Sequence, residues 1–145
     1  MRRLASWWLV LAAIGGCPGA RALPVIAVTG VDFAFIAPDS ATAGPTRFRF
    51  THRGTVPHEL AIARVTLGVR VERVLDTELK GGDVEGLYDP GEGLLYADVG
   101  EHVDAELLVD LQPGRTYVLN CTLDGPGGKS HAMLGMVRPL HVRAR

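Results

Sequence analysis

Three residues near the end of the chain carry side chains that could together bind a soft metal ion: Cys121, His131 and Met136. They offer a thiolate, an imidazole and a thioether within sixteen residues. Thiolate and thioether ligands favour copper, and imidazole also suits it. Zinc accepts cysteine and histidine as well, but a thioether is not among its usual ligands. These residue types therefore predict a copper site.

A rigid domain must supply a fourth ligand from elsewhere, and His58 is the best candidate. It follows Pro57 and precedes an apolar run, so we expect it in a strand, in the same alternating row of side chains as Leu60 and Ile62. One histidine from a distant strand and one loop near the end of the chain are what a rigid β-sandwich can bring together.

Each of these residues also has an explanation without a metal. Cys121 fits a small buried apolar side chain, His58 a polar strand end, and Met136 a core methionine. The close succession of Cys121, His131 and Met136 weighs against these explanations. Met133 is a rival for the thioether ligand, although the glycine before Met136 favours the latter. Three further histidines are expected to be solvated or structural: His52, His102 and His141.

The order of several motifs resembles a known family. The motifs are VPHEL at 56–60, LQPGRTY at 111–117 leading into Cys121, then His131, and GMV at 135–137. Together they resemble the type 1 (blue) copper proteins, the cupredoxins, from about Val25 to the end of the chain. The resemblance implies a Greek-key β-sandwich and one mononuclear type 1 copper ion. It also implies that His58, Cys121 and His131 are trigonal ligands and that Met136 is a weak axial ligand.

The chain departs from this family in the spacing between two of the ligands. Nine residues, 122–130, separate Cys121 from His131, whereas blue copper proteins usually place only a handful there. The insert at 124–129 is rich in glycine and also contains a proline, which are residues typical of turns. We therefore expect a bulged loop that returns His131 to the metal.

The resemblance implies an electron carrier that works with protein redox partners and is not an enzyme. The alternative is a copper chaperone or sensor that binds Cu(I) through Met133, Met136, Cys121 and His131, since a pliable loop suits ion transfer. A third class is an enzyme with Cys121 as nucleophile and His131 as base, but neither an oxyanion hole nor a third orienting residue is recognisable. A metal-free binding module with the same fold also stays open.

Short strand-like segments dominate the chain and must position these ligands. Alternation and β-branched or aromatic residues predict strands at 25–36, 46–51, 56–65, 94–99, 103–111, 115–123 and about 137–143. Apolar spacing within 67–80 predicts one short helix. Because helices and strands do not alternate, we predict an all-β fold, a two-sheet sandwich with at most one short helix.

The first 22 residues have the pattern of an export signal. Arg2 and Arg3 precede an apolar run at 4–14, which is too short to anchor the chain across a bilayer. Two outcomes compete: cleavage after Ala22, which we favour, and lipidation of Cys17 as a membrane anchor. In either case the domain at 23–145 is expected outside the cytoplasm, in the periplasm or on the outer face of the membrane.

The composition is that of one packed domain. The chain has 145 residues, of which 47% are apolar and 21% charged. Loss of the leader removes three of the 15 basic residues and none of the 16 acidic ones, which leaves a net charge of about −4. This charge excludes a basic footprint for nucleic acid, and we expect a monomer. The domain keeps Cys121 as its lone cysteine, a thiol that an oxidising compartment would attack unless a metal occupied it.

Overall fold

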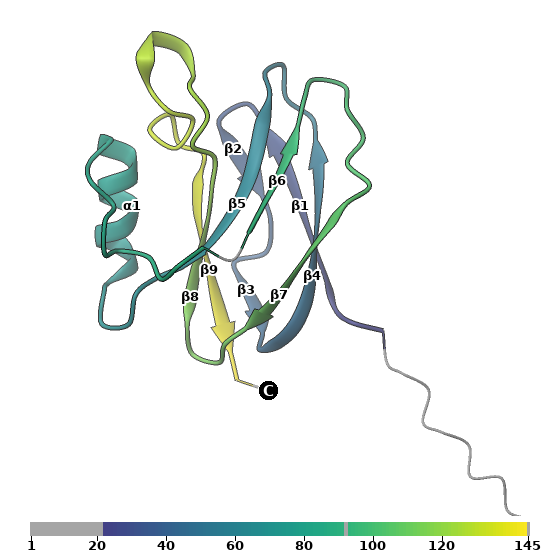
Figure 1. Cartoon of the computed structure of the whole chain (residues 1–145), viewed down its shortest axis with the longest axis vertical. Helices are drawn as coiled ribbons and strands as arrows, with labels where there is room; N and C mark the ends of the chain where they lie inside the picture. The colour runs from purple at the N-terminus through teal and green to yellow at the C-terminus, as the bar shows by residue number, and fades with distance from the viewer. Residues whose placement is uncertain (1–21, 92, 145) are drawn as a thin grey trace, which may run out of the picture.

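The computed structural model describes residues 22–91 and 93–144. Within them the chain forms two packed β-sheets and one α-helix (Figure 1). The expected leader and Cys17 lie outside the described residues, apart from Ala22. The elements are β1 (Val25–Val31), β2 (Ala34–Ile36), β3 (Ser40–Thr42), β4 (Gly44–His52), β5 (His58–Arg64), α1 (Val71–Lys80), β6 (Gly93–Ala97), β7 (Glu106–Leu111), β8 (Thr116–Asn120), the 3-10 turn η1 (Pro126–Gly128) and β9 (Val137–Arg143).

Each sheet combines antiparallel pairs with one parallel pair. The four-stranded sheet has the order β2-β1-β4-β7, and its parallel pair is β1 with β4. The five-stranded sheet has the order β3-β9-β8-β5-β6, and its parallel pair is β3 with β9. The chain crosses between the sheets repeatedly, for example from β4 to β5 and from β6 to β7. The predicted all-β sandwich with one short helix is confirmed.

The hydrophobic core lies between the two sheets, where alternate residues of each strand point inward. In β4, Phe48 and Phe50 are fully buried, while Arg47 and Arg49 point outward and pair with Glu106 on β7. Each fully buried large apolar side chain contributes about 1.5–3 kcal/mol to folding. The core therefore provides a rigid platform beneath the loops at the end of the sandwich.

The segment at 25–36 is two strands, not the single strand predicted. β1 and β2 form an antiparallel hairpin that reverses at Asp32 and Phe33. Phe33 adopts the left-handed backbone conformation, with φ of 59°. Apolar alternation continues through this turn, and the turn lacks the glycine that usually marks such a reversal. Alternation alone therefore could not reveal the hairpin.

Other strand boundaries differ less. The strand predicted at 103–111 begins only at Glu106, and the short β3 was not predicted. β3 has three residues and pairs only along β9, so it carries too little alternation to be recognised in the sequence. The helix predicted within 67–80 is confirmed as α1.

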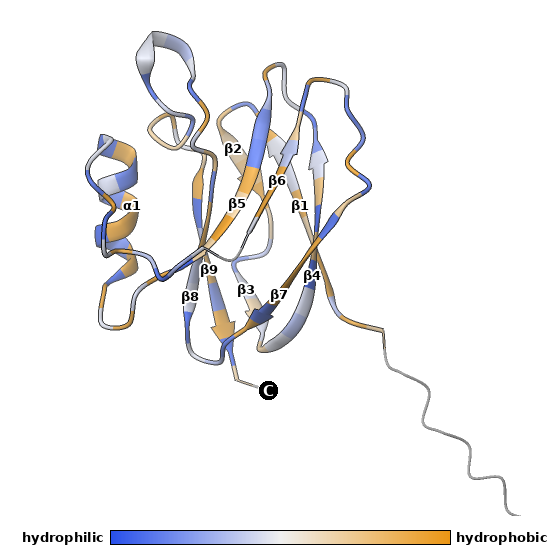
Figure 2. Cartoon of the chain, in the orientation of Figure 1, coloured by the Kyte–Doolittle hydropathy of each residue, from blue (hydrophilic) through white to orange (hydrophobic). Residues whose placement is uncertain are grey.

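Helix α1 covers the outer face of the five-stranded sheet. Its apolar residues (orange in Figure 2) pack against β8 and β9: Val74 of α1 and Val118 of β8 are fully buried, and Val137 of β9 packs beside them. Both faces of β8 are consequently buried, and Tyr117, Leu119 and Cys121 lie in the core between the sheets. None of the helices in the described ranges is long and apolar enough to cross a membrane.

Candidate metal centre

The predicted metal ligands come from three places in the sequence that meet at one end of the sandwich, the upper end in Figure 1. His58 is the first residue of β5, and Cys121 directly follows β8. β5 and β8 are antiparallel neighbours, which places the start of one beside the end of the other. His131 and Met136 lie in the segment that leads into β9.

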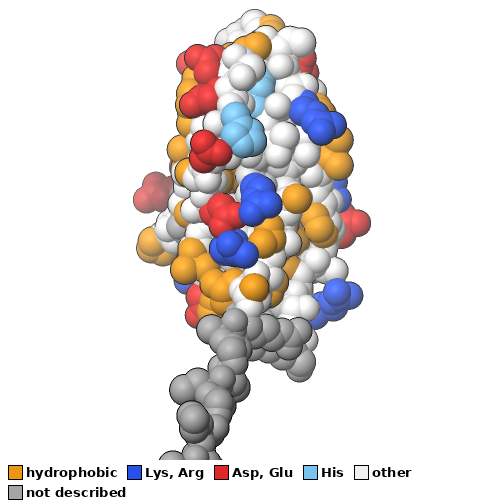
Figure 3. All heavy atoms as spheres, turned by 90° about the vertical axis from the view of Figure 1, so that its right-hand side faces the viewer, with side chains coloured by type: hydrophobic (Ala, Val, Ile, Leu, Met, Phe, Trp, Pro, Cys, Tyr) orange, Lys and Arg blue, Asp and Glu red, His pale blue; other side chains and the backbone are white. Residues whose placement is uncertain are grey.

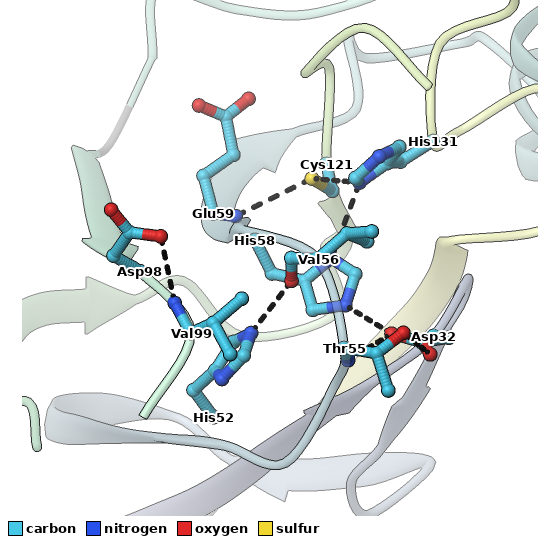
Figure 4. A network of polar contacts seen from close by, with 10 residues as sticks. All are labelled: Asp32, His52, Thr55, Val56, His58, Glu59, Asp98, Val99, Cys121 and His131. Carbon is cyan, nitrogen blue, oxygen red and sulfur yellow. Dashed lines mark hydrogen bonds and ion pairs between the residues drawn. The ribbon is translucent and has the colours of Figure 1, made fainter. Parts of the chain in front are cut away.

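The two imidazoles and the sulfur form one tight cluster (Figure 4). Nδ1 of His58 lies 3.2 Å from Nδ1 of His131, and that nitrogen lies 3.3 Å from Sγ of Cys121. One ligand atom from each of the three residues lies within 4.8 Å of the others. Atoms that share one ion at about 2.0–2.3 Å are roughly 3–4 Å apart, so the cluster has the dimensions of a mononuclear site.

Burial sets the protonation of the three groups. His58 and Cys121 are 0% exposed and His131 is 2% exposed. Burial lowers the pKa of both imidazoles, which keeps them neutral with a lone pair available for a metal. Burial also raises the pKa of the Cys121 thiol. A metal ion must therefore displace a proton from Cys121, and its binding is coupled to proton release.

The sulfur of Cys121 has a hydrogen-bond donor that the sequence did not reveal. The backbone N–H of Glu59 donates to Sγ at 3.3 Å. The Glu59 carboxylate accepts from the backbone N–H of Thr122 at 2.8 Å and from its hydroxyl at 2.6 Å. Glu59 thereby ties the start of β5 to the residue after the cysteine. A buried acid directly after His58 was the available signal for this role.

The two candidate methionines lie in different surroundings. Met136 is fully buried in the same core cluster as Cys121. Its backbone carbonyl accepts from the N–H of Cys121 at 3.1 Å. The sulfur of Met133 instead lies at the end of α1, where a Cβ added at Gly81 would be only 2.7 Å from it. The surroundings therefore favour Met136 over Met133 as a neighbour of the cluster.

The nine-residue segment between Cys121 and His131 is closed at its base. The N–H of His131 donates to the carbonyl of Leu123 at 2.8 Å, and the N–H of Ala132 donates to that of Cys121, also at 2.8 Å. Asp124 and Ser130 form an antiparallel bridge just above. The extra residues thus form an outward bulge that returns His131 to the sulfur, as expected.

This bulge also packs against the imidazole that it returns. A Cβ added at Gly125 would lie 2.8 Å from Cδ2 of His131. On another side, the ring of Phe33 meets His131 edge-on, with centroids 5.1 Å apart. Gly125 and Phe33 explain why His131 is almost completely shielded from solvent.

The remaining histidines lie outside the cluster, as expected. His102 is 88% exposed, and its Nε2 lies 3.2 Å from a carboxylate oxygen of Asp104. Figure 3 shows exposed histidine side chains close to acidic ones on the face that it draws. His141 contacts the hydroxyl of Thr116. His52 is half-buried: its Nε2 lies 2.8 Å from the carbonyl of Val56, and its ring centroid lies 5.1 Å from that of His58.

Comparison with known proteins identifies the fold. No family model and no curated protein matches the chain. An azurin (Az-iso2) from Methylomonas sp. strain J aligns over 84% of this chain and 99% of its own, with a TM-score of 0.51 and 16% identity. An auracyanin from Roseiflexus castenholzii aligns over 83% and 98%, with a TM-score of 0.53 and 18% identity. The fold is that of the cupredoxins.

A second auracyanin structure, auracyanin B, agrees, with a TM-score of 0.53 and 20% identity over 82% of this chain and 88% of its own. Azurin and auracyanin are blue copper cupredoxins. In this cupredoxin fold, the His/Cys/His cluster supplies the donor types that suit one mononuclear copper ion. The cluster fits a nucleophilic enzyme poorly, because Cys121 is inaccessible and its pKa is raised.

Proposed function

We propose that this domain carries single electrons between protein partners through a type 1 copper ion. The proposed ligands are His58, Cys121 and His131, with Met136 as a weak axial ligand. The observation that carries the proposal is the closed cluster of two imidazole nitrogens and one sulfur, buried at one end of a cupredoxin fold.

The copper ion would supply the chemistry, a reversible exchange of one electron between Cu(II) and Cu(I). The protein holds His58 and His131 with Nδ1 facing the cluster, and the N–H of Glu59 stabilises negative charge on the sulfur. Burial excludes water as an extra ligand. Packing restricts movement of the ligands, so little rearrangement accompanies the change of charge.

The copper-handling alternative requires Met133 at the ion. The sulfur of Met133 lies beside Gly81 at the end of α1, and it would have to give up this contact to bind the ion. Its position therefore supports electron transfer instead. Hydrogen bonds from His131 to Leu123 and from Ala132 to Cys121 also close the base of the 122–130 segment. A closed base suits a fixed site better than a pliable one.

The colour of the copper-loaded protein tests the proposal. Full-length protein is expressed in a Gram-negative host, purified after processing and titrated with Cu(II). We expect an intense visible charge-transfer band that Cys121→Ser abolishes. Met133→Leu is expected to leave the band and the copper affinity unchanged. A colourless protein that retains only Cu(I), and loses it in Met133→Leu, would establish copper handling instead.

We also propose export of the domain, with residues 1–22 as the leader and 23–145 as the working protein. Support comes from the leader pattern in the sequence. Mass spectrometry of the processed protein distinguishes cleavage after Ala22 from a lipid on Cys17. Retention of the intact leader in the cytoplasm would contradict export. The processed protein is expected to be a monomer by light scattering.

A further inference from the structure

The outward-facing nitrogen of His58 has a charged partner. Nε2 of His58 lies 3.3 Å from Oδ1 of Asp32, whose side chain is 34% exposed (Figure 4). Nδ1 of the same ring faces the cluster. Because a carboxylate can only accept, this contact places the proton of the neutral ring on Nε2 and leaves Nδ1 with its lone pair toward the cluster.

Asp32 is itself held firmly in place. It occupies the β1–β2 turn, where Oδ1 accepts from the backbone N–H of Thr55 at 2.7 Å and Oδ2 accepts from the Thr55 hydroxyl at 2.6 Å. These two hydrogen bonds fix the orientation of the carboxylate, so that Oδ1 faces Nε2 of His58 as an acceptor. The turn that brings Asp32 to His58 is the hairpin that sequence periodicity did not reveal.

The space for this contact depends on a glycine. A Cβ added at Gly54 would lie 2.4 Å from Nε2 of His58 and 2.6 Å from Oδ1 of Asp32. Both distances are too short for any side chain at this position without moving the pair. Gly54 therefore keeps open the gap in which Asp32 and His58 meet.

We propose that Asp32 is a positioning residue that fixes the tautomer and the orientation of His58 for metal binding. The identity of the metal as copper rests on the proposed function. A carboxylate behind a ligating histidine orients the ring and makes it a stronger donor, and its loss typically weakens metal binding by about 10–100-fold. Its negative charge also favours Cu(II) over Cu(I), which lowers the reduction potential.

Two substitutions at position 32 separate charge from geometry. Asp32→Asn retains an oxygen that can accept from His58 but removes the charge, and we expect a higher reduction potential with a smaller loss of affinity. Asp32→Ala removes both, and we expect about tenfold or greater weakening of copper binding in competition with a chelator. Asp104→Asn is the matched control, because it removes an equal charge from a side chain that is 92% exposed.

Gly54→Ala provides an independent variant that leaves Asp32 unchanged. It is expected to weaken copper binding in the same direction, and the Asp32→Ala/Gly54→Ala double variant is expected to lose less than the sum of both effects. The role of Asp32 would be overturned if the losses of affinity in the double variant were additive. It would also be overturned if Asp32→Asn, Asp32→Ala and Gly54→Ala all left affinity and potential unchanged.

A measurement on metal-free protein keeps this inference distinct from the proposed function. The ¹⁵N shifts of the His58 ring are expected to show the Nε2–H tautomer in the unsubstituted protein and a mixture in Asp32→Ala. An Nδ1–H tautomer in the unsubstituted protein would contradict the positioning role, whatever its copper chemistry. If that protein shows the Nε2–H tautomer yet forms no coloured copper site, the role of Asp32 stands and the proposed electron transfer fails.

Discussion

The backbone N–H of Glu59 lies 3.3 Å from the sulfur of Cys121, although 62 positions separate the two residues. The contact exists because β5 and β8 pair in an antiparallel register that brings the residue after His58 to the residues after Asn120. The same acid accepts two hydrogen bonds from Thr122. Glu59 thus links the two chain segments that supply His58 and Cys121, and brings a carboxylate close to the proposed ion.

Replacing this carboxylate is expected to shift the reduction potential. Glu59→Gln retains an oxygen acceptor for Thr122 and removes a negative charge that favours Cu(II). We expect a rise on the order of 50 mV, where about 59 mV corresponds to a tenfold change in a one-electron equilibrium. Spectroelectrochemistry measures the effect, with the exposed Glu72→Gln on α1 as control. A fall in the potential of Glu59→Gln, or equal shifts in Glu59→Gln and Glu72→Gln, would contradict the prediction.

The packing of the bulge against His131 predicts sensitivity to a single methyl group. In Gly125→Ala the new Cβ would lie 2.8 Å from the His131 ring and 3.1 Å from the carbonyl of Lys129. Overpacking of this kind costs about 1–3 kcal/mol, and each 1.4 kcal/mol corresponds to about a tenfold loss of copper affinity. Gly91→Ala is the control, because a Cβ there meets nothing within 4 Å. Similar affinities in a chelator competition would refute the prediction.

A buried polar network is expected to stabilise the attachment of α1. Glu78 accepts from the hydroxyl of Tyr88 at 2.8 Å and from the side-chain amide of Asn120 at 3.0 Å. Glu78→Ala leaves both donors without this partner and is expected to lower the free energy of unfolding by about 2 kcal/mol or more. Glu78→Gln keeps an oxygen acceptor and is expected to be milder. Urea unfolding of copper-free protein measures the stabilities of the two variants and of the unsubstituted protein. Equal stabilities of all three would disprove the prediction.

The ion pairs around Asp89 predict a loss of stability in acid. Its carboxylate contacts Nε of Arg64 at 2.7 Å and a guanidinium nitrogen of Arg115 at 2.8 Å, and both hold its pKa below the usual 3.8. Because the folded pKa lies below the unfolded one, this stabilisation is complete above the unfolded value and is lost as the pH falls through the folded value.

Substitution of Asp89 tests that pH dependence. Asp89→Asn is expected to be less stable than the unsubstituted protein at pH 7, with a difference that shrinks as the pH falls below about 4. Urea unfolding of copper-free protein at several pH values measures it. A difference that stays constant, or grows, toward low pH would show that the charge of Asp89 does not contribute.

Much of the architecture could be predicted from the sequence, since side-chain alternation in a strand is a local property. β9 was predicted with its observed limits, and α1 was recognised within 67–80. The hairpin at Asp32 and Phe33 was not predicted, because its turn interrupts neither the apolar alternation nor the β-branched composition. The resemblance to cupredoxins, carried by short motifs, is confirmed at the level of the fold.

The donor types and their order can be read from the sequence, because thiolate, imidazole and thioether preferences belong to the residues and not to their surroundings. The side chains that support the cluster could not be read in this way, because they meet it only after folding. The contacts of Asp32 with His58, of Glu59 with Cys121 and of Met133 with α1 depend on strand register and loop path. A strand takes the register that buries its apolar face against its neighbours, so these contacts depend on segments far apart in the chain.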